Sequence, residues 1–451
     1  MNGHLLVQNT SLVLAREIVE GDLRVVNGII DTIAEGGGLE PKNEEKVIDG
    51  TGLHLLPGAI DPHVHFREPG DLKNEDLESG SRAAAAGGVT SFLDMPNNTP
   101  NATNRSILEE KISLASKKSV THHGFFIGAT KDNLRDLQSI EGMDGVCGIK
   151  IFMGSSTGDL LVHEQSHLEN IFANTGGIIA THAEDEERLR RRISEFGHSL
   201  DISSHAKCRD VECAFLATKR AAALARDHDH RLHIVHLTSG KEADWMVQNK
   251  GSLITTEVCT QHLTFDQDDV ERIGERILMN PPIRYTEDKE TLWKRLRDGT
   301  IDCVVTDHAP HTLEAKSVGF PNSPAGMPGV ETSLPLMLTH AINGKCSVTD
   351  VARWMCAGPA KVYGIQNKGS LIEGYDGDLT LVDLETRRVI TDSDTWTKVG
   401  WTPYDGMELT GWPMYTIVDG RVVHKRQPGG SLRGDSLSPA GSSGRVLKFD
   451  N

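Results

Sequence analysis

Eight short apolar runs, each followed by a longer helical stretch, dominate the chain between residues 58 and 307. Most runs are continuously apolar rather than alternating, which is typical of strands buried on both faces of a parallel sheet. The stretches between them favour amphipathic helices, for example over 75–86, 105–118, 211–226 and 241–249. The predicted strands are 59–65, 89–94, 123–129, 148–152, 177–182, 232–237, 252–258 and 301–307.

This alternation predicts an α/β fold, a (β/α)8 TIM-like barrel, whose active site lies at the carboxyl ends of the strands. A doubly wound open sheet would show the same alternation. The count of eight and the side chains at the strand ends favour the barrel. A chain of 451 residues also leaves room for a smaller second unit.

The segments that flank the barrel are rich in short strands and turns. Residues 25–30 resemble a hairpin through Asn27 and Gly28, and 377–382 and 416–423 have the same character. We expect the flanks to pair into a small β-sandwich domain, because domain termini often lie close together. The predicted organisation is a small β-rich domain from 1–52 and 367–426, the barrel over 53–366, and a Gly/Ser/Pro-rich flexible tail over 427–451.

Composition excludes several classes of function. The net charge is −17 and no basic stripe is present, which argues against nucleic-acid binding. No apolar run approaches the ~20 residues of a membrane span, and the N-terminus lacks the pattern of a signal peptide. Seven scattered cysteines without a CxxC indicate reduced thiols, so we expect a cytoplasmic protein.

Histidines stand where the predicted strands end. His63 and His65 are two apart on the first strand, so both imidazoles point to the same face, into the mouth of the barrel. His182, His236 and Asp307 close the fifth, sixth and eighth strands. Five such ligands exceed what one catalytic zinc takes from a protein, so the sequence predicts a site for two metal ions.

Lys150 lies in the apolar fourth strand, where a free ammonium would be costly to bury and would repel cations. A lysine whose head reaches solvent is the ordinary alternative, but apolar residues flank it on both sides. Carboxylation by CO2 would turn this side chain into a carbamate anion that can bridge two metals. We therefore hypothesise a carbamate on Lys150.

The motifs together resemble the dihydroorotases, members of the cyclic amidohydrolase superfamily. The resemblance extends over almost all of the chain to about residue 425, with the motifs in family order. The Arg after HVHF, the Pro-Asn-Asn and the Asp-His-Ala-Pro-His sequence are its more specific parts. The motifs are 63–70 (HVHFREPG), 94–99 (DMPNNT), 148–150 (GIK), 181–184 (THAE), 236–240 (HLTSG), 280–284 (NPPIR), 307–311 (DHAPH) and 324–331 (PAGMPGVE).

The resemblance implies a role for each candidate residue. One zinc would be held by His63, His65 and Asp307 and the other by His182 and His236, with the Lys150 carbamate between them. The residues implied to bind the substrate are Arg67, Asn97 and His311 at its carboxylate, and Asn280 with backbone near Ala325 and Gly326 at its ring. Arg67 also fits on chemical grounds, because a guanidinium beside metal ligands is a bidentate clamp for a carboxylate.

The implied reaction is the reversible zinc-dependent cyclisation of N-carbamoyl-L-aspartate to L-dihydroorotate and water, in pyrimidine (UMP) synthesis. Asp307 would serve as general base and then acid, and the Gly/Pro-rich residues 311–329 would form a loop over this small anionic substrate. The oligomeric state stays open, a homo-oligomer included.

The nearest alternative is a hydantoinase or allantoinase, which share the metal core but lack the Arg67 clamp together with His311. A non-catalytic scaffold on the same barrel is a third alternative, although all six metal positions are filled. His205, Cys208 and Cys213 have loosely metal-like spacing, but we expect them at the start of a helix, and we expect His262 and the pair His122–His123 to be structural.

Overall fold

The computed structural model describes residues 3–155, 160–197, 200–427, 436–437, 441 and 443–450. Eight parallel strands follow one another in chain order around a nearly closed barrel. Closure between the last strand and the first is made by a bridge of Val64 to His308, where the His65 amide donates to the His308 carbonyl at 2.8 Å. The strands are β6 (Ala59–Val64), β7 (Val89–Asp94), β8 (His122–Gly128), β9 (Val146–Phe152), β10 (Ile178–His182), β11 (Arg231–Ile234), β12 (Ile254–Cys259) and β13 (Cys303–Val305).

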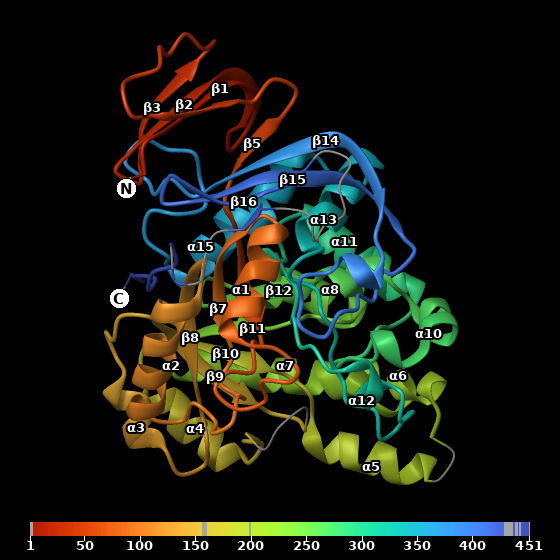
Figure 1. The fold of residues 1–451 in the computed structure, drawn as a ribbon. Helices are drawn as coiled ribbons and strands as arrows, with labels where there is room; N and C mark the ends of the chain where they lie inside the picture. The colour runs from red at the N-terminus through yellow and green to blue at the C-terminus, as the bar shows by residue number, and fades with distance from the viewer. Residues whose placement is uncertain are drawn as a thin grey trace.

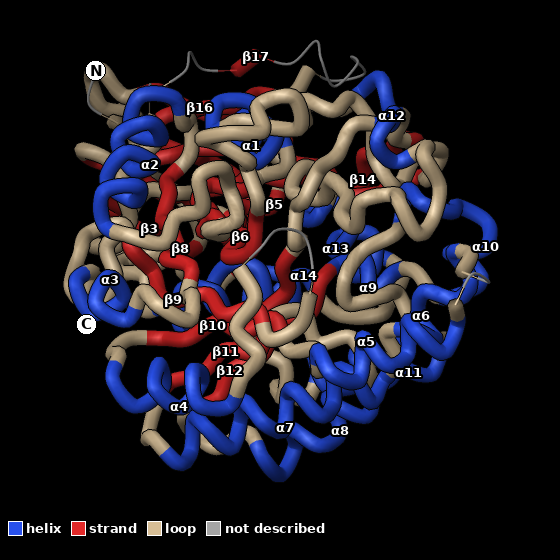
Figure 2. The backbone as a smooth tube through the Cα atoms, turned by 90° about the horizontal axis from the view of Figure 1, so that it is seen from below, coloured by secondary structure: helices blue, strands red, loops and turns tan. Residues whose placement is uncertain are grey.

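Helices surround these strands, as Figure 2 shows from below, so the predicted barrel is confirmed. Side-chain caps start several helices where the sequence offers an Asp, Asn or Ser, such as Asp76, Asn104 and Ser239. The helices are α1 (Leu77–Ala86), α2 (Arg105–Lys118), α3 (Leu134–Ser139), α4 (Gln165–Asn174), α5 (Glu186–Phe196), α6 (His205–Cys208), α7 (Val211–Asp227), α8 (Gly240–Asn249), α9 (Thr260–Thr264), α10 (Gln267–Ile273), α11 (Thr286–Arg297), α12 (Leu313–Lys316), α13 (Ser333–Ile342), α14 (Val348–Ala352) and α15 (Gly358–Tyr363).

The two flanks of the chain meet in a second sheet, seen in Figure 1 as red and blue strands above the barrel. The expected hairpin through Asn27 and Gly28 joins β2 to β3, and both turn residues have positive φ. β5 lies beyond the expected boundary at residue 52 and pairs with both β1 and β14. The strands are β1 (Leu5–Val13), β2 (Ile18–Val26), β3 (Ile29–Glu35), β4 (Lys46–Asp49), β5 (His54–Pro57), β14 (Leu379–Val389), β15 (Glu408–Val418), β16 (Arg421–Lys425) and β17 (Ser436–Leu437).

The C-terminal segment differs in part from the expected flexible tail. Much of 427–451 lies outside the described residues, but 443–450 are attached to the barrel. Leu447 is fully buried, Val446 bridges to His123, and the Arg445 guanidinium pairs with Asp376 and Asp419. Apolar contacts and ion pairs therefore hold a segment whose polar surroundings in the sequence suggested mobility.

Each sheet has a hydrophobic core. The barrel is filled by Ile, Val, Leu, Phe and Ala side chains of its strands and the inner faces of its helices, whereas the small sheet has its own cluster around Leu5, Leu23 and Leu379. Among the described residues, the search for a helix long and apolar enough to cross a bilayer finds none.

Candidate active site

The predicted metal ligands converge at the carboxyl ends of the barrel strands. His63 lies in β6, Lys150 in β9 and His182 at the end of β10, while His236 and Asp307 follow β11 and β13 directly. All of them line one cavity. The cavity is lined by His63, His65, Arg67, Asn97, Lys150, Phe152, His182, His236, Asn280, Asp307, Ala309, Ala325 and Gly326.

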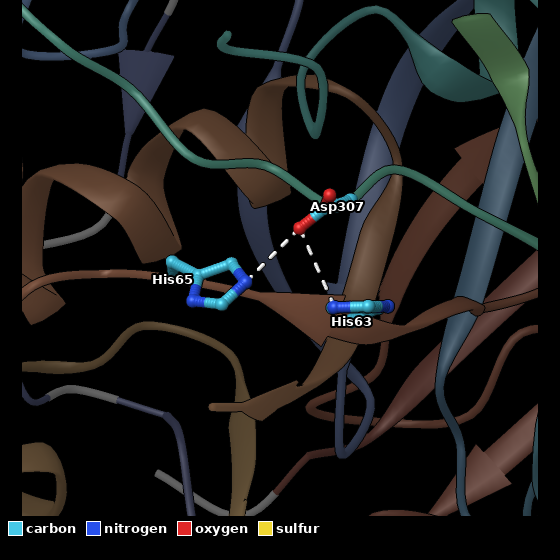
Figure 3. A group of neighbouring side chains, drawn as sticks. All are labelled: His63, His65 and Asp307. Atoms are coloured by element: carbon cyan, nitrogen blue, oxygen red, sulfur yellow. Dashed lines mark ion pairs between the residues drawn. The ribbon is translucent and has the colours of Figure 1, made fainter. Parts of the chain in front are cut away.

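Three of the ligands form one group, drawn in Figure 3. Oδ1 of Asp307 lies 3.0 Å from Nε2 of His65 and 3.4 Å from Nε2 of His63. All three residues are at least nine-tenths buried. Two imidazole nitrogens and a carboxylate oxygen that face one point are a donor set that suits a divalent cation such as zinc.

His182 and His236 form a second group beside the first. Nδ1 of His182 lies 3.0 Å from Nε2 of His236. The ring of His236 also stacks on that of His63, with centroids 5.3 Å apart, so the two groups adjoin. The geometry provides two neighbouring sets of nitrogen ligands within one cavity.

In three of these rings, the nitrogen that points away from the metal-ligand group is hydrogen-bonded to a carboxylate or amide oxygen. Nδ1 of His63 faces Glu257 at 2.6 Å, Nε2 of His182 faces Glu184 at 2.9 Å, and Nδ1 of His65 faces Asn97 at 2.5 Å. Such partners fix the tautomer and direct the other nitrogen to a metal. Neither Glu257 nor Glu184, which lies in the 181–184 motif, was predicted to belong to the site; a Glu within an apolar strand run was the available signal for Glu257.

Burial favours the neutral form of three imidazoles of the site, and the carboxylate of Asp307 stays ionised. Burial lowers the pKa of His65 to about 4 and also lowers the pKa values of His182 and His236. Burial alone would raise the pKa of Asp307, but His63 and His65 hold it below its ordinary value. Neutral histidine and ionised aspartate are the forms that bind metal.

Lys150 is buried in the same cavity without a hydrogen-bond partner for its Nζ. Its pKa falls to about 8 because burial penalises the charged form. The ammonium lies 5.1 Å from the centre of the Phe152 ring. An unpartnered buried amine among metal ligands fits a side chain that carries a further anionic group, since an unmodified ammonium gains little from this environment.

The backbone is unusual at three of these positions. Arg67, His236 and Asp307 have φ values of 63°, 39° and 47°, in the left-handed region that side chains other than glycine rarely adopt. Such conformations cluster at functional sites, where the surrounding structure imposes them. Here they turn the chain sharply at the rim, just after β6, β11 and β13.

All of the predicted substrate-binding residues except His311 line the cavity. Arg67 is 5% exposed, and its Nη2 lies 3.3 Å from both the Pro310 carbonyl and Nε2 of His311. His311 does not itself line the cavity but contacts the Ala325 carbonyl at 3.2 Å. The backbone at Gly326 comes so close to the segment after β13 that a Cβ would lie 2.4 Å from the Ala309 carbonyl oxygen.

The remaining histidines contact other groups. His205 bonds through Nε2 to Oδ1 of Asn280 at 2.9 Å, and no metal-ligand group in the described chain combines it with Cys208 or Cys213. His122 lies with Asp378 and Asp419 at the far end of β8, and His262 contacts the Pro281 carbonyl. These contacts are structural in kind.

Comparisons with known proteins agree with this geometry. The model of the amidohydrolase family matches residues 54–423. A dihydroorotase of Methanosarcina acetivorans is 34% identical over 92% of this chain and 91% of its own, and one of Pyrococcus furiosus is 30% identical over 98% of each. The solved structure of the L-hydantoinase (dihydropyrimidinase) from Arthrobacter aurescens is 30% identical, with a TM-score of 0.91 over 99% of this chain and 100% of that one.

Proposed function

The chain belongs to the amidohydrolase family, and from this premise we propose that it is a dihydroorotase. The enzyme interconverts N-carbamoyl-L-aspartate and L-dihydroorotate plus water, a ring closure used in pyrimidine synthesis. The dihydroorotases to which the chain is similar cover nearly its whole length. The hydantoinase similarity supports the same barrel, but hydantoin has no carboxylate that could pair with Arg67.

The observation that carries this choice is the unpaired guanidinium of Arg67. Among the described residues no carboxylate lies within ion-pair distance of it, and its buried Nε has no hydrogen-bond partner. A buried guanidinium that makes no direct ion pair within the described chain is costly, so the site calls for an anion from outside. Dihydroorotate carries a carboxylate beside its ring, whereas hydantoin and allantoin have none.

We further propose two zinc ions in the cavity. His63, His65 and Asp307 would hold one and His182 and His236 the other, with a CO2-derived carbamate on Lys150 between them. The support is the donor set, the neutral imidazoles and the unpartnered Nζ of Lys150. When bound, the ions would activate water and polarise the ring carbonyl.

The protein side chains do the remaining work. Asp307 accepts a proton from the attacking water and passes it to the departing ring nitrogen, and it runs the same steps backwards in ring closure. Arg67, Asn97 and His311 would bind the substrate carboxylate. Asn280 and the backbone of Ala325 and Gly326 would contact the ring and hold its amide bond at the metal ligands.

The proposed setting follows from the same observations. All seven cysteines are free thiols, which fits a reducing compartment, and we propose that the protein works in the cytoplasm on a small anionic substrate. A homo-oligomer is compatible with these features.

One experiment compares three substrates. Purified protein with measured zinc content is assayed for hydrolysis of L-dihydroorotate, hydantoin and allantoin. We expect two zinc ions per chain, a preference for dihydroorotate, and a carbamate resonance in the ¹³C NMR spectrum of the intact protein loaded with ¹³C-bicarbonate, which the Lys150→Ala variant lacks. A preference for hydantoin or allantoin would replace the proposal with the rival activity. If Lys150 is unmodified, no metal is bound and bicarbonate does not restore activity, the carbamate hypothesis is wrong.

A further inference from the structure

Lys316 is a buried lysine without a carboxylate partner in the part of the chain that the structure describes. It is the last residue of the short helix α12, which follows His311 and Thr312, and its side chain is only 2% exposed. Burial lowers the pKa of this amine to about 7, with only a distant Glu275 acting against it. A lysine of this kind is costly to bury, so its contacts require an explanation.

All three donors of the ammonium are used on backbone carbonyls. Nζ donates to the carbonyl oxygens of Pro324 at 2.8 Å, Gly326 at 3.0 Å and Leu278 at 3.2 Å. An ammonium has three donors and no acceptor, so this set satisfies it completely. The three carbonyls belong to two segments that are far apart in the sequence, and the lysine ties them together.

Both segments carry residues that are proposed to contact the substrate ring. Asn280 lies two residues after Leu278. Ala325 lies between Pro324 and Gly326, whose carbonyls accept the other two hydrogen bonds. Asn280, Ala325 and Gly326 all line the cavity of the candidate metal ligands. A direct hydrogen bond from the Gly326 amide to the Leu278 carbonyl, at 2.8 Å, runs beside the lysine. The Ala325 carbonyl in turn contacts His311.

The ammonium itself does not reach the substrate. The described residues that line the cavity do not include Lys316, and its donors are already engaged. Arg67 differs from Lys316 because it lines the cavity and its Nε has no hydrogen-bond partner. A role for Lys316 therefore has to run through the carbonyls that it holds.

We propose that Lys316 is a positioning residue, which pins the 324–326 loop to the 278–280 segment and so sets where Asn280 and the Ala325–Gly326 backbone meet the substrate ring. The inference rests on the proposed function for the identity of that ring. The hydrogen bonds by which Lys316 joins the two segments do not depend on the proposed function. Loss of the ammonium leaves the carbonyls of Pro324 and Gly326 without this donor, and the loop loosens.

The first measurement does not involve activity. Amide hydrogen exchange is followed in wild type and in Lys316→Met, which keeps the length of the side chain but cannot donate. We expect exchange of the Gly326 amide and of peptides from 317–326 to become at least about tenfold faster. Local opening of the variant no longer requires the hydrogen bonds from the Lys316 ammonium to be broken. Unchanged exchange there would overturn the proposal.

The second measurement separates positioning from folding. For Lys316→Met we expect the KM for dihydroorotate to rise about tenfold while kcat falls by less than about threefold, since ring contacts of this kind bind substrate and transition state alike. Zinc content should equal that of wild type. If exchange quickens but KM does not change, the loop is tied without consequence for the substrate and the proposed role is wrong.

Lys361→Met is the matched control. Lys361 is exposed on α15 at the opposite end of the barrel, so its variant removes the same charge far from the loop. We expect wild-type exchange and kinetics from it. If Lys316→Met does not fold, Lys316→Leu, which also lacks a donor, takes its place in both measurements.

The proposed function and this inference fail in different ways. Wild-type protein that opens hydantoin but not dihydroorotate would refute the function, and KM would then be measured with hydantoin. The hydrogen-exchange measurement would test in the same way whether Lys316 joins the two segments. Wild-type activity on dihydroorotate with an unaffected Lys316→Met variant would refute the inference alone.

Discussion

Nδ1 of His63 donates to Oε1 of Glu257 at 2.6 Å, and both side chains are buried within the barrel. The second carboxylate oxygen of Glu257 lies 3.0 Å from Nε2 of His233, so one carboxylate joins a candidate metal ligand to a histidine deeper in the barrel. The bond leaves Nε2 of His63 as the nitrogen that faces Asp307. Glu257 thereby orients the ring and increases its basicity as a ligand.

Replacing Glu257 should therefore weaken metal binding. We expect Glu257→Gln to bind zinc about 10–100-fold more weakly, the range typical of lost outer partners of metal-binding histidines. Competition with a chromophoric chelator measures the affinity. Glu242→Gln is the control, because Glu242 is an equally buried glutamate that bonds to Thr218 and Ser239 away from the cavity. Equal losses in both variants would contradict a specific role for Glu257.

Arg67→Gln should lose substrate binding and keep its fold. Loss of a charge-assisted clamp predicts a rise of about 100-fold in the KM for dihydroorotate. The thermal midpoint should stay the same or rise, because the variant no longer buries an unpaired charge. Steady-state kinetics and a thermal scan test both, with Arg191→Gln on the exposed face of α5 as control. A normal KM would mean that Arg67 does not bind the substrate.

Asp307→Asn should retain metal and lose turnover. The amide keeps the shape of the side chain but cannot take the proton, so we expect kcat to fall by about 10²–10⁴-fold. Zinc analysis and a dihydroorotate assay on the same sample give the result. Asp302→Asn, at the other end of β13 and paired with Lys250, should remain active. Near-normal activity of Asp307→Asn would remove Asp307 from the mechanism.

Glu331 makes a prediction about pH and stability. Burial raises the pKa of this carboxyl from 4.5 to about 8, so the folded protein keeps a proton that the unfolded chain releases. Stability from this group is therefore lost as pH rises from 4.5 to about 8. Glutamine does not titrate and can still accept the Trp396 amide, which Glu331 accepts at 2.7 Å.

We expect Glu331→Gln to be more stable than wild type by roughly 1–3 kcal/mol at pH 8, with a smaller gain at pH 5. Thermal scans at both pH values measure the difference between the two proteins. Glu187→Gln, an exposed position on α5, should show no such dependence. A gain that is equal at both pH values would mean that ionisation of Glu331 is not the cause.

The sequence predicted most of the barrel because its strands are continuous apolar runs. The predicted run 89–94 has the same limits as β7, and the other seven overlap their strands. His63, His65, His182, His236 and Asp307 were found because parallel strands of one barrel end at one rim. Strand order and direction therefore sufficed to bring these residues together.

The contacts around the ligands depend on details that periodicity does not contain. Glu257 meets His63 from a position 194 residues away, through the closure of the barrel. His205, expected only to open a helix, contacts Asn280, and Lys316 gave no signal at all because its partners are main-chain carbonyls. The packing of 443–450 was missed because its apolar residues, Val446, Leu447 and Phe449, form only a short run after a long polar stretch.

The pairing of β5 with β14 has a consequence for how the protein is made. A ribosome delivers β5 early, yet the partner strand emerges only after every barrel strand has been translated. Until then the amino-terminal strands carry an open edge, and a nascent chain stalled before residue 379 keeps that edge available to other nascent chains. The two flanks of the barrel thus join only after the strands between them have been made.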